Sequence, residues 1–237
     1  GLDQARAKGY TGKGITVAII DGKVDASISE LAGADVTVKS PCTIYSSPGS
    51  TTHGTGVASI LVSPNYGVAP EASLIAYPMT AGLAGDKSGT DCGGSGSADK
   101  DSQPWLLNWA MNDGAQIINL SASSSYSGAQ MKWVIARAMS SGVILVSSAG
   151  NDSDDANEDH LSKWSGVVGV TAISVDGNRQ DYSSWGQGVV TTTIGGPVLF
   201  RNLETGANDT TFGTSVAAPI VTGVLALAKQ RWPEATS

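Results

Sequence analysis

The chain is short of charged side chains, and of basic ones above all. Charged residues make up 15% of the 237 residues and hydrophobic residues 41%, a balance that excludes a disordered chain and supports a large buried core. Lysine and arginine number 14 against 21 acidic residues, so the net charge is -7. Proteins that bind nucleic acids depend on basic contacts to phosphate, so we expect no nucleic-acid partner.

Long hydrophobic runs are also missing. No apolar stretch reaches the roughly 18 residues that a membrane span needs, and the opening segment GLDQARAKGY is too polar for a signal peptide. The sequence therefore predicts a protein without a membrane span. It is either cytoplasmic or exported with its leader already removed.

Only two cysteines occur, Cys42 in KSPCTIYSS and Cys92 in GTDCGGSG. Both segments are polar and typical of loops, where a free thiol would be exposed. We predict a disulfide between them, with two unrelated buried thiols as the alternative. The bridge would close a loop of about 50 residues, worth about 4 kcal/mol in the chain-entropy account. It would also indicate an oxidising compartment.

Short apolar runs rich in β-branched residues alternate with helical patterns along the chain. The runs predict strands at 15–21, 72–79, 115–121, 142–150 and 166–173, and the patterns predict helices at 53–62, 104–113, 129–140 and 214–231. Continuous apolar strands are typical of a parallel sheet covered on both faces. We therefore predict an α/β fold, a three-layer α/β/α arrangement with a mostly parallel central sheet, as a single domain over residues 1–237.

The chain has two histidines, so there are two imidazole candidates for acid–base chemistry. His53 lies in TTHGTGVASIL, where it would begin a helix, and a capping role is the alternative. His160 lies among acidic residues and is interpreted as a surface histidine. Asp21 ends the strand VAIID, at the edge where parallel sheets collect catalytic groups. An aspartate before a glycine is also common in turns.

Ser215 begins a helix in an unusual setting, TFGTSVAAPIV. A helix N-terminus offers free N–H groups and the positive end of the helix dipole. The small pair Ala217 and Ala218 leaves space beside the serine for an incoming carbonyl group. A simple capping serine is the alternative interpretation of this position.

Four segments, taken together, are more specific than any one of them. VAIIDGKVD, HGTGVAS and GTSVAAP resemble, in this order, the signature segments of the subtilisin-like serine proteases, the subtilases. SSAGND at 147–152 resembles the strand end that carries their oxyanion-hole asparagine. The resemblance covers essentially the whole chain. It implies a serine endopeptidase in which Ser215 attacks the carbonyl, His53 is the general base and Asp21 orients His53. Asn151 and the Ser215 N–H would hold the oxyanion.

The resemblance also implies where substrate binds. The segment NLSASS would pair with extended peptide, and SSAG would form one wall of the first specificity pocket. The residues concerned are Ser121, Ala122 and Ser123 in the first segment and Ser148, Ala149 and Gly150 in the second. A serine-rich loop without this function is the alternative for the first segment.

The family resemblance sets further expectations. It implies a secreted monomer that acts on peptide or protein substrates. A propeptide and a trimmed or processed C-terminal end are compatible with the family pattern. The chemistry requires no cofactor. A structural calcium ion at the acidic segment 151–159 is an alternative to a solvated loop but is not predicted. Gly56 stands where the family commonly has a second histidine.

Two other functions stay open. The acyl group could pass to an amine, as in a peptide-maturation protease or macrocyclase, and loop 80–103 is the material from which a cover over the leaving-group side could form. The chain could also be a peptide-binding module without catalysis. The four intact chemical positions argue against that last hypothesis.

Overall fold

A computed structural model describes most of the chain. The described residues are 1–41, 43–79, 87–88, 102–121, 128–155 and 160–236. Among them, no helix has both the length and the apolar character that crossing a membrane requires.

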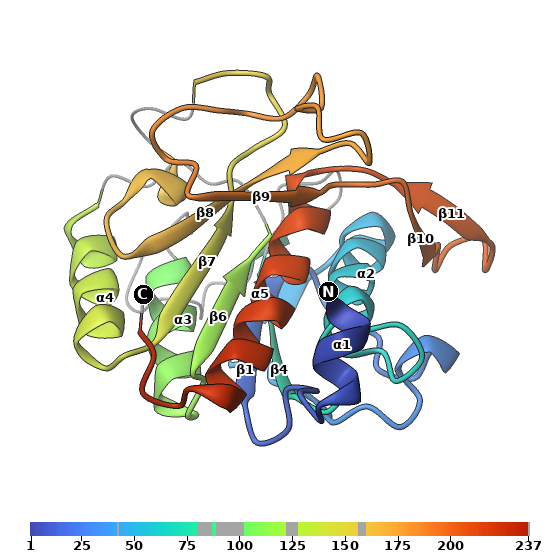
Figure 1. Ribbon diagram of the computed structural model, residues 1–237, viewed down its shortest axis with the longest axis horizontal. Coiled ribbons are helices and arrows are strands. Elements are labelled where there is room, and N and C mark those ends of the chain that lie inside the picture. Colours follow the sequence, from blue (N-terminus) through green and yellow to red (C-terminus); the bar gives the residue numbers. More distant parts are fainter. Residues whose placement is uncertain (42, 80–86, 89–101, 122–127, 156–159, 237) are drawn as a thin grey trace.

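A seven-stranded sheet forms the centre of the molecule, with the strand order β2-β4-β1-β6-β7-β8-β9 (Figure 1). All its neighbouring strands pair in parallel. The strands are β1 (Thr16–Asp21), β2 (Val36–Val38), β4 (Ser73–Pro78), β6 (Ile117–Leu120), β7 (Ile144–Ser148), β8 (Val167–Ile173) and β9 (Thr191–Ile194). The five predicted strands agree with β1, β4, β6, β7 and β8 to within two residues at each end. The sequence pattern did not indicate the two edge strands, β2 and β9.

Helices cover both faces of this sheet, which confirms the predicted three-layer fold. They are α1 (Leu2–Ala7), α2 (Pro48–Val62), α3 (Ser102–Asn112), α4 (Ala129–Ser140) and α5 (Thr214–Arg231), with 3-10 turns at Ser29–Leu31 and Leu161–Lys163. Alternate residues of β1 enter two separate cores. Val17 and Ile19 pack with α2 and α5 on one face, whereas Ala18 and Ile20 pack with α3 and α4 on the other.

Two small antiparallel pairs stand outside the main sheet. One consists of β10 (Val198–Arg201) and β11 (Asn208–Thr211), and the other of β3 (Ile44–Tyr45) and β5 (Lys87–Ser88). The β10–β11 hairpin leads directly into α5 (Figure 1). It therefore lies next to the start of the helix that carries Ser215.

Helix α2 begins earlier than predicted. It starts at Pro48, and Ser47 caps it by accepting a hydrogen bond from the Ser50 N–H at 3.2 Å. The predicted start at His53 was wrong because residues 49–54 lack apolar periodicity, although proline after a serine cap is a favourable helix start. His53 consequently lies inside a formed helix rather than at its end.

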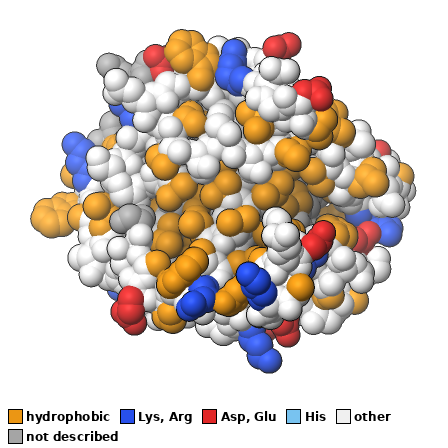
Figure 2. All heavy atoms as spheres, viewed as in Figure 1, with side chains coloured by type: hydrophobic (Ala, Val, Ile, Leu, Met, Phe, Trp, Pro, Cys, Tyr) orange, Lys and Arg blue, Asp and Glu red, His pale blue; other side chains and the backbone are white. Residues whose placement is uncertain are grey.

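Helix α5 packs tightly against the sheet and against the segment that follows α2. The Thr222 hydroxyl lies 2.9 Å from the Asn119 side-chain oxygen, and both residues are fully buried. A methyl group on Gly223 would lie 2.5 Å from the Val68 Cβ, so glycine is required for this approach. Figure 2 shows hydrophobic side chains gathered over the outer side of α5, where Val224 is 51% exposed.

We predict that Gly223→Ala lowers the free energy of unfolding by about 1–3 kcal/mol, because the added methyl group overpacks the contact with Val68. In an unobstructed helix the same change would stabilise by about 1 kcal/mol. Gly56→Ala is the matched control, since its nearest neighbour would be 3.6 Å away. Urea denaturation of both variants tests this, and equal stability of the two would contradict it.

Candidate active site

The elements that carry the candidate catalytic residues come together at the carboxyl-end edge of the sheet (Figure 1). Asp21 is the last residue of β1, Asn151 lies three residues beyond the end of β7, and Ser215 is the second residue of α5. His53 comes from α2, which packs beside α5. Parallel strands place their carboxyl ends at one edge, so residues nearly 200 positions apart in the sequence share one site.

Asp21 and His53 are joined by a short hydrogen bond. The Asp21 Oδ1 atom lies 2.7 Å from the His53 Nδ1 atom, and it also accepts a 2.6 Å hydrogen bond from the Gly22 N–H. Asp21 is fully buried, and its Oδ2 atom is without a hydrogen-bond partner among the described residues. The His53 side chain is 30% exposed. A buried carboxylate therefore fixes the ring through Nδ1, which leaves Nε2 to act.

The charge of Asp21 changes the basicity of His53. It raises the pKa of His53 above the ordinary value of 6.5, and partial burial of the ring opposes this rise. The carboxylate stabilises the imidazolium form that appears when His53 takes up a proton. The pair is thus suited to general base chemistry near neutral pH.

Two glycines allow the backbones to come close enough for this bond. A Cβ atom on Gly22 would lie 2.0 Å from the Ser50 carbonyl oxygen, and one on Gly54 would lie 2.2 Å from the Gly22 carbonyl oxygen. Neither glycine has a positive φ angle, so the requirement is space rather than conformation. The loop after β1 therefore lies directly on the first turns of α2.

The Asn151 side chain is held by Thr214. Its Oδ1 atom accepts hydrogen bonds from the Thr214 N–H at 2.9 Å and from the Thr214 hydroxyl at 3.0 Å. With Oδ1 engaged as an acceptor, the Nδ2 atom is the part of the side chain that can donate. A Cβ atom on Gly213 would lie 3.0 Å from the Ser215 Oγ atom and 3.2 Å from the Asn151 Nδ2 atom. Glycine at 213, with φ of 146°, keeps that space open.

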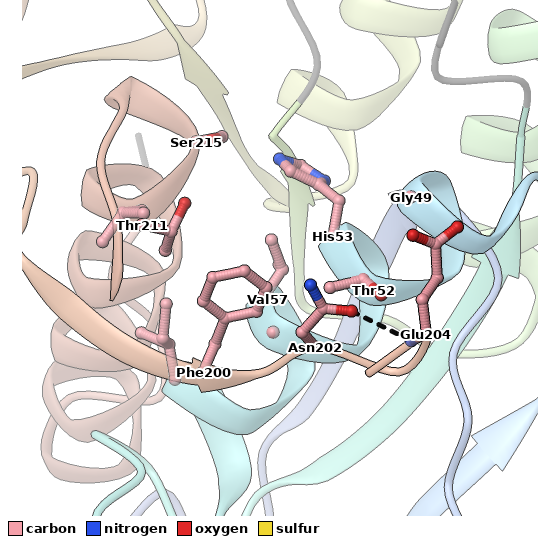
Figure 3. Close-up of a pocket in the computed structure, with 12 residues that line it drawn as sticks. Gly49, Thr52, His53, Val57, Phe200, Asn202, Glu204, Thr211 and Ser215 are labelled. Carbon is pink, nitrogen blue, oxygen red and sulfur yellow. Dashed lines mark hydrogen bonds between the residues drawn. The ribbon is translucent and has the colours of Figure 1, made fainter. Parts of the chain in front are cut away.

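Ser215 and His53 line the same cavity (Figure 3). Ser215 is 9% exposed, which leaves its hydroxyl within reach of the cavity. It is the second residue of the helix, where a backbone N–H has no partner within the helix. The Ser215 N–H and the Asn151 amide are therefore two donors beside one hydroxyl, an arrangement that can stabilise a negatively charged oxygen.

Four of the six predicted substrate-binding residues are described, and these four lie at the ends of β6 and β7. Ser121 follows β6 directly, and its hydroxyl accepts a 2.8 Å hydrogen bond from the Asn119 amide. Ser148 ends β7, and Gly150 has φ of 107° and donates its N–H to the Thr214 hydroxyl. Ala149 is fully buried. Ala122 and Ser123 are outside the described residues.

His160 does not stand free on the surface as predicted. A Cβ atom on Gly150 would lie 3.1 Å from its ring, and its Nδ1 atom is buried without a hydrogen-bond partner in the described part of the chain. Its acidic neighbours indicated a solvated loop, but this position packs behind the end of β7. No group of three or more potential metal ligands occurs among the described residues. Cys42, Cys92 and most of loop 80–103 fall outside them.

Sequence reasoning missed the residues that position the predicted ones. Nothing in the sequence indicated that Thr214 holds the Asn151 amide. Phe200 and Glu204 of the β10–β11 hairpin were not singled out, yet they line the cavity with His53. A usable signal existed for Gly22 and Gly54, since each glycine directly follows a candidate catalytic residue.

Comparisons with known proteins agree with this geometry. The chain matches the family described as the Subtilase family over residues 12–237. A thermostable alkaline protease of Halalkalibacterium halodurans is 31% identical over 241 residues, which cover 99% of this chain and 62% of the relative. Subtilisin E of Bacillus subtilis is 29% identical over 255 residues, which cover 100% of this chain and 62% of the relative. The chain thus spans less than two thirds of the length of these curated relatives.

Solved structures give the same picture. The prenylagaramide maturation protease PagA superposes with a TM-score of 0.79 at 28% identity, covering 100% of this chain and 83% of that chain. The PatG macrocyclase in complex with peptide reaches a TM-score of 0.82 at 21% identity, with coverage of 100% and 83%. At 21% identity, the similarity to PatG shows a shared fold and nothing more.

We predict that His53 titrates above pH 6.5 and that Asp21→Asn moves its pKa below that value. The charge that raises the pKa is then gone, while burial still lowers it. The measurement is an NMR pH titration of the imidazole signals. The variant His160→Gln removes one of the two histidines and so identifies which signals belong to His53. Asp25→Asn is the control, because Asp25 bonds to Ser27 rather than to His53. A His53 pKa unaffected by Asp21→Asn would contradict the assignment.

We also predict that Gly22→Ala pushes the loop after β1 away from α2 and lengthens the bond between Asp21 and His53. A displacement of about 1 Å in a catalytic group costs about 10²-fold in rate, so any activity that depends on the pair should fall by that order. Gly128→Ala adds the same methyl group where nothing lies within 4 Å. Equal activity in the two variants would show that the close approach is not required.

Proposed function

Because this chain belongs to the subtilase family, we propose that it is a serine endopeptidase that hydrolyses peptide bonds in extended polypeptides through an acyl-enzyme. The observation that carries the proposal is the 2.7 Å bond between the buried Asp21 carboxylate and His53. That bond orients a general base in the same cavity that Ser215 lines. A histidine that served only to cap a helix would have no need of this bond.

The proposed reaction begins when the Ser215 Oγ atom attacks the carbonyl carbon and His53 Nε2 takes its proton. Asp21 stabilises the imidazolium that results. The tetrahedral oxyanion accepts hydrogen bonds from the Asn151 side chain and the Ser215 N–H. His53 then gives its proton to the leaving amine, and the acyl-enzyme forms. Water, deprotonated by the same histidine, attacks the ester and releases the acid and free Ser215.

The substrate lies extended between the ends of β6 and β7 in this proposal. The segment from Ser121 to Ser123 pairs with the peptide backbone, and the segment from Ser148 to Gly150 forms a wall of the pocket for the side chain before the cut. Buried Ser121 and the fixed Gly150 support this placement, because both are held by hydrogen bonds to neighbouring elements. Pairing through the backbone gives affinity with little selectivity for side chains.

We further propose that the chain acts as a secreted, monomeric, single-domain peptidase that needs no cofactor for its chemistry. The proposed export is consistent with the proposed disulfide between Cys42 and Cys92, because disulfides persist in oxidising compartments outside the cytosol. A propeptide is compatible with the 62% share of the curated relatives that the chain spans. A structural calcium ion stays outside the proposal.

A second function has one observation in its favour. PagA, which shares 28% identity and a TM-score of 0.79 with this chain, is a maturation protease. The acyl-enzyme of this chain could likewise pass its acyl group to an amine instead of water. Mass spectrometry of the products distinguishes the two, because hydrolysis gives linear acids and aminolysis gives joined or cyclic peptides. Hydrolysis remains our main proposal.

We predict that a fluorophosphonate probe labels Ser215 in the unmodified protein and fails to label Ser215→Ala. The reagent needs an activated serine hydroxyl, which only a base such as His53 provides. Ser140→Ala, an exposed serine at the end of α4, is the control and should label fully. Well-folded protein that resists labelling would end the case for an enzyme.

We predict that Asn151→Ala lowers kcat by about 10²–10³-fold with a smaller change in KM, because the lost amide acts on the oxyanion of the transition state. The magnitude is that of the corresponding donor in a subtilisin. Asp152→Asn, an exposed neighbour, should keep the rate of the parent protein. The measurement is the steady-state rate of peptide hydrolysis by each variant. A change confined to KM would contradict the prediction and assign Asn151 to ground-state binding.

A further inference from the structure

We propose that the cavity beside His53 and Ser215 receives a large apolar side chain from the first residue after the scissile bond. We further propose that Glu204 at its rim favours a basic residue in the next position. The inference rests on the proposed endopeptidase function and adds a preference for the departing segment of the substrate.

The cavity lies between α2, the β10–β11 hairpin and the start of α5 (Figure 3). Its volume is about 300 Å³, at the lower end of the range for ligand pockets. That volume suits one large side chain rather than a whole peptide. Its apolar lining consists of Gly56, Val57, Ile60, Phe200 and Val216.

The position of the cavity assigns it to the leaving group. Among the described residues, its lining includes Ser215 and His53 but neither Asn151 nor any residue at the ends of β6 and β7. The oxyanion donor and the proposed acyl-side segments therefore lie on the other side of the reacting pair. His53 delivers its proton to the departing amine, so the chain that leaves begins next to this cavity.

Gly56 and Phe200 give the cavity its shape. A Cβ atom on Gly56 would lie 3.6 Å from the Phe200 ring, an ordinary contact distance. The absence of a side chain at 56 leaves the space between α2 and the ring open. Figure 3 shows the Phe200 ring projecting into that space below Ser215 and His53. An aromatic or long aliphatic side chain would bury apolar surface there and contact the ring.

Specific contacts fix the hairpin wall in place. The Leu203 N–H donates a 3.1 Å hydrogen bond to the Thr52 hydroxyl on α2. Arg201 of β10 forms a 2.9 Å ion pair with Glu30, and neither residue belongs to the described lining of the cavity. The wall is therefore built into the fold by two separate neighbours, and the cavity keeps its form without a substrate.

Glu204 adds charge to the rim. It lies in the turn of the hairpin, where the Asn202 side chain accepts a 2.9 Å hydrogen bond from its N–H (Figure 3). Glu204 is exposed and lines the cavity, and Figure 3 shows its carboxylate on the side of the cavity away from Phe200. A lysine or arginine just beyond the pocket residue would reach this carboxylate with its charge still in water.

The test uses fluorescence-quenched peptides that are identical up to the cut. The first residue after the cut is Phe, Leu or Gly, and the second is Lys or Glu. We expect kcat/KM at least about tenfold higher for Phe than for Gly, as pocket filling by an apolar group provides. Lys should exceed Glu in the second position by about two- to fivefold, the range of an exposed ion pair.

Variants identify the residues responsible. Gly56→Leu fills the cavity and should remove the preference for Phe over Gly, and Gly56→Ala should reduce it in part. Glu204→Gln should remove the preference for Lys. Glu234→Gln is its matched control, because it removes the same charge beyond the far end of α5. Fluorophosphonate labelling of every variant reports that Ser215 and His53 still work.

The outcomes separate two failures. Full labelling with equal rates for Phe, Leu and Gly would overturn the inference and leave the proposed function intact. A Gly56→Leu variant that labels normally but slows all peptides alike would also overturn it, since the cavity would then be irrelevant to selection. Absence of labelling in the parent protein would overturn the function and the inference together.

Discussion

The contact between the loop after β1 and helix α2 is the constraint on which the site depends. At Gly22 and Gly54 two backbones pass so close that a single methyl group would lie about 2 Å from a carbonyl oxygen. This approach lets the Asp21 carboxylate reach the His53 ring while Asp21 stays fully buried. Burial without the histidine would leave a charge unpaired, a state that proteins avoid. The two glycines therefore permit the contact that pairs the buried aspartate, and this pairing in turn sets the basicity of the histidine.

A second contact ties the oxygen-binding side to the same frame. Thr214 holds the Asn151 amide through two hydrogen bonds and receives the Gly150 N–H. The residue before the proposed nucleophile thus connects the end of β7 with the start of α5. Because α5 also packs into the core through Thr222 and Gly223, donors and hydroxyl sit on rigid elements. Such preorganisation is what makes hydrogen-bond donors effective in a transition state.

The sequence predicted the main layers well because their signals are local. Helices 129–140 and 214–231 and the five central strands show clear periodicity or continuous apolar runs, and the structure confirms them. Motif order likewise indicated Asp21, His53, Asn151 and Ser215. The start of α2, the edge strands and the cavity were not predicted. Residues 49–54 lack an apolar pattern, and Phe200 meets Gly56 only through tertiary packing that no local signal encodes. The contact of Thr214 with Asn151 likewise joins residues 63 positions apart, and no local signal indicates it.

The position of α5 in the sequence and in the fold affects when the site can form during synthesis. Asp21 and His53 come more than 160 residues before Ser215 in the sequence, and Ser215 lies on a helix that packs against both α2 and the central sheet. During synthesis the two members of the acid–base pair are therefore made well before the hydroxyl that they would activate. The proposed triad is complete only once α5 has docked, so the order of translation would delay any cleavage of the chain by itself.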